Sequence, residues 1–189
     1  MAPLTRYYCA ASLDGYIAES DDSLDWLTGY EGSFEGADSD EKQAGYESFY
    51  KGIGALVMGS VTYEWVLAHV EQWPYPDMPV WVLSSRELPQ PEGNEVPVRV
   101  VDAQVADLID ELLGAAADRD LWIVGGGNVA SQFADSGLLD RLEITLVPVV
   151  LGSGKPLFAG PLRRPMQLLG ARTFSSGMVG LSYEVRPAS

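Results

Sequence analysis

Three consecutive glycines, Gly125 to Gly127, follow the apolar run Leu121 to Val124 and precede a helical pattern in which Val129 and Phe133 share a face. Glycines lack a Cβ, so the backbone can approach a phosphate closely, and the first N–H groups of a helix attract anions. The segment is therefore typical of a phosphate-binding turn. The alternative is a plain connection from strand to helix in which the glycines supply only flexibility.

The single histidine, His69, and the single cysteine, Cys9, limit the other chemistry that the chain can perform. Neither a disulfide within the chain nor a cysteine-rich metal site is possible, and a Ser/His/Asp triad would have to use His69. Cys9 lies in the apolar first strand, so we expect a buried core thiol. His69 stands at a helix end, where we expect a surface residue or a partner of the helix dipole. We predict no metal site.

Acidic residues outnumber basic residues by 27 to 12, which gives a formal charge of -15. This charge argues against a surface that binds nucleic acid or anionic membranes, because phosphates would be repelled. The 189 residues, of which 47% are hydrophobic, fit one domain that spans residues 1–189. There is no stretch of eighteen apolar residues and no signal-peptide pattern. We therefore predict a cytoplasmic protein.

Short apolar runs alternate with helical patterns through the first two thirds of the sequence. The expected strands are Thr5 to Ala11, Ala55 to Met58, Val80 to Leu83, Val98 to Val101 and Leu121 to Val124. The expected helices are Glu41 to Tyr50, Thr62 to Ala68 and Val105 to Ala117. This alternation predicts a parallel sheet with helices on both faces.

The pattern changes after Asp140. Residues Leu142 to Val150, Gln167 to Phe174 and Val179 to Val185 read as strands, and the last two form a hairpin. Two segments, 19–40 and 73–79, read as irregular. Because Trp26 and neighbouring leucines lie in the first of them, this segment is either a lid over a pocket or a long surface loop.

Several motifs follow one another in a specific order along the chain. They are Ala11 to Ala18, Val57 to Glu64, Val82 to Arg86 and Ile123 to Phe133, followed by Leu142 to Leu146 and Val150 to Phe158. In order and spacing they resemble the dihydrofolate reductase superfamily over nearly the whole chain. Residues Ser12 to Gly15 and Leu151 to Gly154 favour the reductase domain of the bifunctional riboflavin-biosynthesis deaminase/reductase and the stand-alone proteins similar to it.

The resemblance implies an α/β fold of three layers, with a mostly parallel central sheet and an antiparallel C-terminal hairpin. It also implies an NADPH-dependent oxidoreductase that transfers a hydride to a C=O or C=N group of a small substrate, as the riboflavin-pathway 5-amino-6-(5-phosphoribosylamino)uracil reductase does. A homodimer is expected from the same resemblance.

Each motif has a physical reason to contact the cofactor that the resemblance implies. Backbone groups of the first strand and the following turn meet the nicotinamide amide, and the two glycine turns meet the diphosphate. Two hydroxyls and a guanidinium suit the ribose 2′-phosphate, although an exposed surface turn is the alternative. The implied cofactor-binding residues are Ala10, Ile17, Gly59, Ser60, Thr62, Ser84, Ser85, Arg86, Val124, Gly125, Gly126, Gly127, Asn128 and Val129. The resemblance further predicts a cis peptide between Gly125 and Gly126.

The catalytic candidates are Asp14, Tyr46 and Glu47. Asp14 either forms a turn by accepting backbone hydrogen bonds or faces the substrate. Tyr46 donates a hydrogen bond into the pocket or packs in the core. In folate reductases an acidic residue on the first helix faces the pterin; here that position falls at Gln43 or Gly45, so folate reduction is disfavoured. Glu47 either replaces this acid or is an exposed helical glutamate.

Two other readings remain open. Residues Gly125 to Ala130 satisfy the Gly-x-Gly-x-x-Ala pattern of a Rossmann dehydrogenase, but Glu143 begins its strand where an acidic residue should end it. Since no matched acid is evident, the same fold could instead serve as a non-catalytic nucleotide-binding or interaction module.

Overall fold

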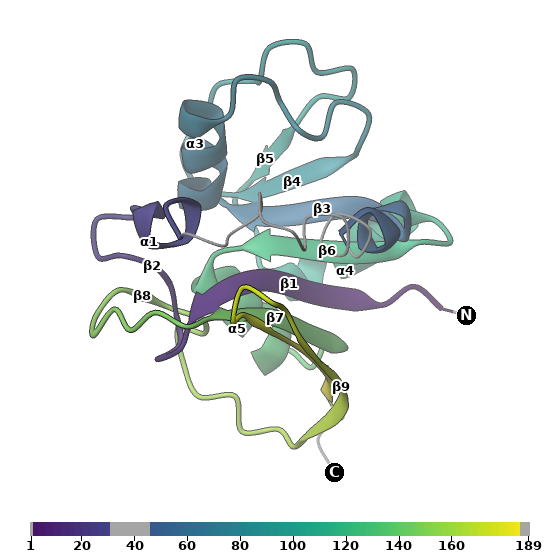
Figure 1. The fold of residues 1–189 in the computed structure, drawn as a ribbon. Helices are drawn as coiled ribbons and strands as arrows, with labels where there is room; N and C mark the ends of the chain where they lie inside the picture. The colour runs from purple at the N-terminus through teal and green to yellow at the C-terminus, as the bar shows by residue number, and fades with distance from the viewer. Residues whose placement is uncertain (1, 31–45, 186–189) are drawn as a thin grey trace.

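The computed structural model describes residues 2–30 and 46–185, and its centre is an eight-stranded sheet with the order β5-β4-β3-β6-β1-β7-β10-β9 (Figure 1). The strands are β1 Thr5–Ser12, β3 Ile53–Gly59, β4 Val80–Leu83, β5 Arg99–Val101, β6 Asp120–Gly125, β7 Arg141–Val147, β9 Met166–Thr173 and β10 Val179–Val185. A small second sheet joins β2 Tyr16–Ala18 to β8 Lys155–Pro156. The helices are α1 Asp25–Thr28, α3 Ser60–His69, α4 Val105–Ala116 and α5 Gly127–Asp135, and residues 46–51 are also helical.

The pairing of the strands is parallel from β5 through β7 and antiparallel at the C-terminal hairpin. Strand β1 is parallel to both β6 and β7, whereas β10 is antiparallel to both β7 and β9. Strand β3 is buried along nearly its whole length, as expected of a parallel strand covered on both faces. The predicted mostly parallel sheet with an antiparallel C-terminal hairpin is therefore confirmed.

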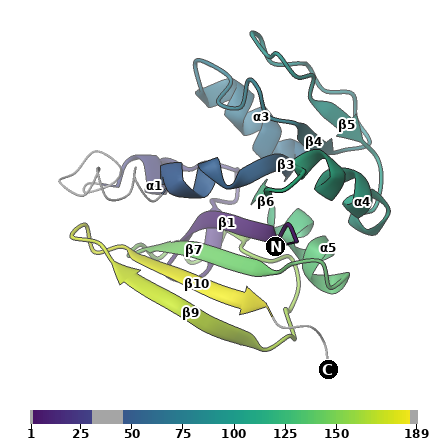
Figure 2. The same cartoon turned by 90° about the vertical axis from the view of Figure 1, so that its right-hand side faces the viewer.

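Helices cover the sheet on both faces and give three layers (Figure 2). On one face, α4 packs through Leu112 and α5 through Phe133 against Tyr7 and Ile123 of the sheet. Helix α4 buries Val105, Leu108, Leu112 and Ala116, which are spaced three or four residues apart and so share one side. On the other face, α3 and residues 46–51 pack beside the buried strands β3 and β4.

Most boundaries differ from the expected ones by one or two residues, but two differences have a clear cause. Strand β7 ends at Val147 rather than at Val150, because Pro148 has no N–H group to continue the ladder. The segment 19–40 contains the short helix α1, and its part from residue 31 on lies outside the described residues. The expected helix from Glu41 likewise begins there. None of the described helices has the length and apolar composition needed to span a membrane.

Candidate active site

Four of the sequence motifs lie in a row at one edge of the sheet, because the strands that precede them are neighbours. Strands β4, β3, β6 and β1 are neighbours and parallel, so their carboxyl ends meet at the same edge. Residues 84–86 follow β4, residues 59–62 follow β3, residues 125–129 follow β6 and residues 13–17 follow β1. With strands about 4.8 Å apart, the row extends over roughly 14 Å. Ligands of open α/β sheets bind at such carboxyl edges.

The two glycine turns lie beside each other within this row. Helix α3 begins directly after Gly59, and helix α5 begins directly after Gly126. A Cβ placed on Gly126 would lie 3.8 Å from the backbone nitrogen of Gly59. Neither helix receives a hydrogen bond from a side chain at its N-cap. Two helix N-termini, each with partial positive charge, therefore converge on the space between β3 and β6.

The three glycines have different structural roles. Gly126 has a φ of +92°, a left-handed conformation that favours glycine. The predicted cis peptide between Gly125 and Gly126 is wrong, because no described peptide bond is cis and the conformation of Gly126 already turns the chain. A Cβ on Gly127 would lie only 2.2 Å from the carbonyl oxygen of Pro156. Gly127 is thus needed for the close packing of α5 against the segment at β8.

A cavity of about 1090 Å³ opens on the sheet face opposite α4 and α5, next to the glycine turn. It is lined by the predicted site residues Ala10, Ile17, Tyr46, Thr62, Val124, Gly125 and Gly126. The remaining predicted residues do not line it: Asp14, Glu47, Gly59, Ser60, Ser84, Ser85, Arg86, Gly127, Asn128 and Val129. The structure therefore brings both nicotinamide candidates and part of the two glycine turns to the cavity, whereas the rest of these turns and residues 84–86 lie outside its lining.

Asp14 lies outside the cavity and joins two loops. Its carboxylate accepts hydrogen bonds from the Ser12 hydroxyl at 2.7 Å, from the backbone of Leu151 at 3.1 Å and from the backbone of Gly152 at 2.7 Å. These bonds, chiefly the one from Ser12, hold the pKa of Asp14 below its ordinary value because they favour the charged carboxylate. The contacts are those of a turn-forming residue that ties the β1–β2 turn to the loop before β8.

Arg86 is already engaged by a carboxylate of the protein. Its two terminal nitrogens donate to the two carboxylate oxygens of Glu64 on α3, at 3.0 and 2.8 Å, and both side chains are exposed. The hydrogen bonds that Arg86 donates to Glu64 raise the pKa of Arg86, because they stabilise its charged form. The backbone nitrogen of Arg86 donates to the Ser84 hydroxyl. A 2′-phosphate at this point would share the guanidinium with Glu64.

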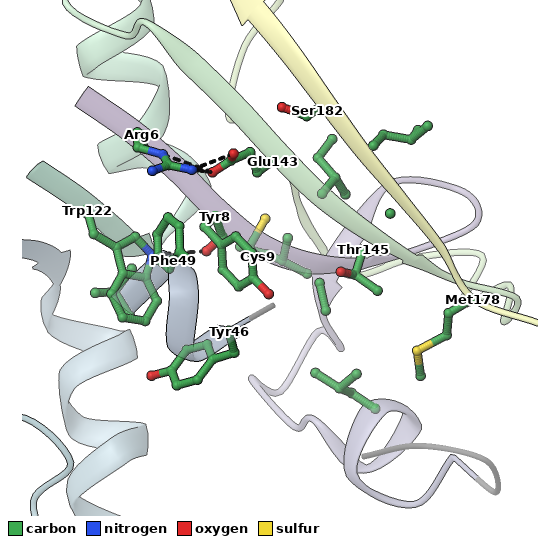
Figure 3. A pocket seen from close by; sticks show the side chains of 18 of the residues that line it. Arg6, Tyr8, Cys9, Tyr46, Phe49, Trp122, Glu143, Thr145, Met178 and Ser182 are labelled. Carbon is green, nitrogen blue, oxygen red and sulfur yellow. Dashed lines mark hydrogen bonds and ion pairs between the residues drawn. The ribbon is translucent and has the colours of Figure 1, made fainter. Parts of the chain in front are cut away.

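A charged cluster that sequence reasoning missed lies at the far end of the cavity (Figure 3). Arg6 donates to both carboxylate oxygens of Glu143, at 2.6 to 3.1 Å, and to Asp120 at 3.1 Å. Burial would lower the pKa of Arg6, but its hydrogen bonds to Glu143 and Asp120 outweigh this effect and raise it. Arg6 and Glu143 are charged residues within the strands β1 and β7, each between residues with large hydrophobic or aromatic side chains or at one end of such a run. That signal was visible in the sequence, whereas their proximity depends on β1 lying next to β7.

Aromatic side chains form the wall beside this cluster. Phe49 stacks on Tyr8 with 4.4 Å between ring centroids, and the guanidinium of Arg6 lies 4.6 Å from the Phe49 ring. Trp122 packs edge-on against Phe49. Burial raises the pKa of Tyr8 and of Tyr46, so both phenols remain protonated at neutral pH and can donate hydrogen bonds. Tyr46 packs against Tyr8 and lines the cavity, but it is 38% exposed, so the expected core role is wrong. Its role as a hydrogen-bond donor in the pocket stays a prediction.

Trp26 and Lys155 both contact other residues of the protein and do not line the cavity. Trp26 is buried against Val147 and Met178 and does not itself line the cavity, whereas Leu24 and Leu27 do. Lys155, in β8, forms an ion pair with Asp22 at 3.3 Å.

Cys9 and His69 have distinct surroundings. As a residue Cys9 is only partly buried, but its side chain packs against the core on the side of α4 and α5, and burial raises the pKa of the thiol to about 12. His69 stacks on Trp65 of the same helix, with 4.4 Å between ring centroids, and is exposed. It lies outside the cavity, as expected for a surface residue.

Comparisons with known proteins agree with this geometry. Residues 3–180 match the family described as the RibD C-terminal domain. The Bacillus subtilis protein YwjB, itself uncharacterized, is 33% identical over 154 residues, which cover 82% of each chain. A crystal structure of a putative riboflavin biosynthesis protein from Shewanella sp. PV-4 superposes with a TM-score of 0.80 at 31% identity, covering 97% of this chain and 99% of that one.

The fold is also that of dihydrofolate reductases. The Enterococcus faecalis dihydrofolate reductase, solved with NADP(H), superposes with a TM-score of 0.60 at 18% identity and covers 98% of both chains. The predicted dihydrofolate-reductase-like fold is therefore confirmed. The match over residues 3–180 is decisive for the family, and the chain belongs to the RibD C-terminal domain family.

Proposed function

We propose that this protein is an NADPH-dependent reductase that transfers a hydride to a C=O or C=N group of a small substrate, as the riboflavin-pathway reductase does. One observation carries the proposal: the four motifs occupy the carboxyl ends of four adjacent parallel strands in strand order. This row leads into a cavity large enough for a small-molecule substrate. The family membership supports the same reaction class.

The residues along the row fit the cofactor chemically. The N-termini of α3 and α5 supply uncapped backbone N–H groups for a diphosphate, and Thr62 adds a hydroxyl beside Gly125. Ser84, Ser85 and Arg86 supply polar groups for the ribose phosphate at the end of β4. Ala10 and Ile17 would contact the nicotinamide where the cavity begins. When bound, NADPH would supply the hydride to the carbon of the C=O or C=N group and would itself be oxidised to NADP⁺.

Side-chain hydroxyl groups in the cavity can supply the proton that the reduced C=O or C=N group needs. The acceptor oxygen or nitrogen must take a proton as its carbon takes the hydride. Hydroxyl groups of Tyr8, Tyr46, Thr145 and Ser182 line the cavity and can donate directly or through water. The aromatic wall of Phe49 and Trp122 excludes water from one side of this space.

Titration with NADPH and NADH tests the cofactor assignment. We expect tighter binding of NADPH, and Arg86→Ala should remove most of this preference because only NADPH carries the 2′-phosphate. Arg99→Ala is the matched control, since Arg99 is also an exposed arginine paired with a helix glutamate, Glu111, but lies at the start of β5. Equal loss for both nucleotides in Arg86→Ala would refute the role of Arg86. NADPH binding without oxidation by any carbonyl or imine compound would favour the non-catalytic module.

We also propose a homodimer that pairs through β9. This strand lies at the edge of the described sheet, and all of its residues are exposed. Met166, Leu168 and Leu169 are 42 to 52% exposed, although apolar edge strands are normally protected. Light scattering of the purified protein should give twice the monomer mass, and Leu168→Lys should shift it toward the monomer. A monomeric wild-type protein at micromolar concentration would refute the dimer.

A further inference from the structure

Polar groups on the cavity floor form a row across three strands. The register places Tyr8 of β1 opposite Glu143 of β7, and Glu143 opposite Ser182 of β10. On the next strand Ser182 lies opposite Gly170, which has no side chain, and a Cβ there would meet no atom within 4 Å. The row therefore presents a phenol, a carboxylate and a hydroxyl to an open space, with the carboxylate in the middle.

Glu143 is the fixed member of this row. Arg6 holds the carboxylate through three hydrogen-bond contacts, two of them to Oε2 and one to Oε1. Arg6 is itself held by Asp120 and by the ring of Phe49. The carboxylate thus has a defined position even without a ligand, which is the condition for selective recognition.

The carboxylate keeps acceptor capacity toward the cavity. A carboxylate can accept about four hydrogen bonds, and Oε1 accepts one from Arg6. The side chain of Glu143 is 18% exposed, and it lines the cavity (Figure 3). A ligand group that is an anion or only a hydrogen-bond acceptor would be repelled by Oε1 of Glu143. An N–H or O–H group at the same place would form a charge-assisted hydrogen bond, which the surrounding aromatic side chains protect from water.

We propose that Glu143 determines which substrates the cavity binds, because its carboxylate selects substrates whose ring carries an N–H group that donates a hydrogen bond. Arg6 is the positioning residue that holds this carboxylate in place. This inference rests on the proposed reductase function for its biological meaning, but the preference is a property of the cavity alone. The preference for a ring with an N–H group can therefore be measured without NADPH. If that preference is absent, the proposal for Glu143 is wrong, but the proposed reductase function is not affected.

Two small rings of the same shape test the proposal directly. In 2-aminopyrimidine the exocyclic group is a donor, and in 2-methylpyrimidine a methyl group replaces it. We expect the wild-type protein to bind 2-aminopyrimidine about tenfold more tightly, the effect of one hydrogen bond to a charged group. Binding is followed by NMR, and a shift of the Trp122 indole N–H signal shows that the ring occupies this cavity, since Trp122 is part of its wall.

Matched variants separate recognition from structure. Glu143→Gln keeps the shape but replaces one acceptor oxygen with a donor, so the preference for 2-aminopyrimidine should fall to about twofold or less. Asp120→Asn also removes one carboxylate partner of Arg6, but Asp120 does not line the cavity, so the preference should remain near tenfold. Equal binding of the two rings by the wild-type protein would overturn the proposal. An unchanged preference in Glu143→Gln would overturn it as well.

Discussion

The third glycine of the turn, Gly127, tests how closely α5 must pack against the segment at β8. In Gly127→Ala the new Cβ would lie 2.2 Å from the carbonyl oxygen of Pro156 and 3.1 Å from that of Leu157. Contacts of a Cβ below 3.0 Å are essentially never tolerated, so α5 and the segment at β8 must separate by about 0.8 Å. Both neighbours are backbone atoms and cannot rotate away.

The cost follows from the contacts that this separation strains. Overpacking of this kind costs about 1 to 3 kcal/mol. The hydrogen bond from the Ala159 nitrogen to the Gly127 oxygen, already 3.2 Å long, adds about 1 kcal/mol when lost. We expect the free energy of unfolding to fall by about 3 kcal/mol. For a chain of this length that corresponds to a decrease of roughly 6 to 12 °C in Tm.

Gly114→Ala is the control, because it makes the same chemical change with the opposite expected sign. Gly114 lies exposed within α4, and a Cβ there would meet no atom within 4 Å. Alanine should therefore stabilise the helix by about 1 kcal/mol and raise Tm by roughly 2 to 4 °C. Thermal unfolding by circular dichroism measures both variants. A Gly127→Ala protein with the wild-type Tm would refute the packing argument.

Three further predictions concern the cavity and its surroundings. Because its hydrogen bonds lower the pKa of Asp14, the charged form stabilises the fold above the ordinary aspartate pKa of about 3.9, and this contribution is lost as the pH falls through the lowered value. Asp14→Asn should thus have a lower Tm than the wild-type protein at pH 7, and the gap should narrow toward pH 3; a gap independent of pH would contradict this. With a pKa of about 12, the Cys9 thiol should react with iodoacetamide at pH 8 far more slowly than glutathione, as mass spectrometry can measure, and a comparable rate would contradict its burial. Gly170→Val should fill open space on the cavity floor, weakening acceptor binding at least tenfold while NADPH affinity and Tm stay near wild type; unchanged acceptor binding would place the substrate elsewhere.

The features that could be predicted from the sequence are those with local causes. The apolar runs that became β3, β4 and β6, and the glycines that end two of them, act through backbone preferences within a few residues. Their arrangement at one sheet edge followed from the rule that parallel strands share their carboxyl edge. The motifs and their order could thus be recognised without any long-range contact, and the binding of a cofactor at this edge stays a prediction.

The features that could not be predicted depend on residues distant in the sequence. Arg6 and Glu143 are 137 residues apart, and only the placement of β1 beside β7 brings them together. The reason for Gly127 lies at Pro156, which the local glycine pattern does not reveal. Asp14 has two chemically reasonable roles in its tripeptide, and the partners at Leu151 and Gly152 show which contacts it makes. The cis peptide was inferred from resemblance alone and failed.

The central position of β1 has a consequence for how the protein is made. Strand β1 is synthesised before its hydrogen-bonded neighbours β6 and β7, and β6 begins 116 residues after Leu4. At about 5 to 20 residues per second, a ribosome needs roughly 6 to 23 s to produce that length. Throughout this interval both edges of β1 lack their native partner strands, and Tyr7 and Ala11, which are buried in the finished fold, lack the later residues that cover them. Completion of the sheet must therefore wait until β6 and β7 have emerged, and a high proportion of such non-local pairing predicts slow folding.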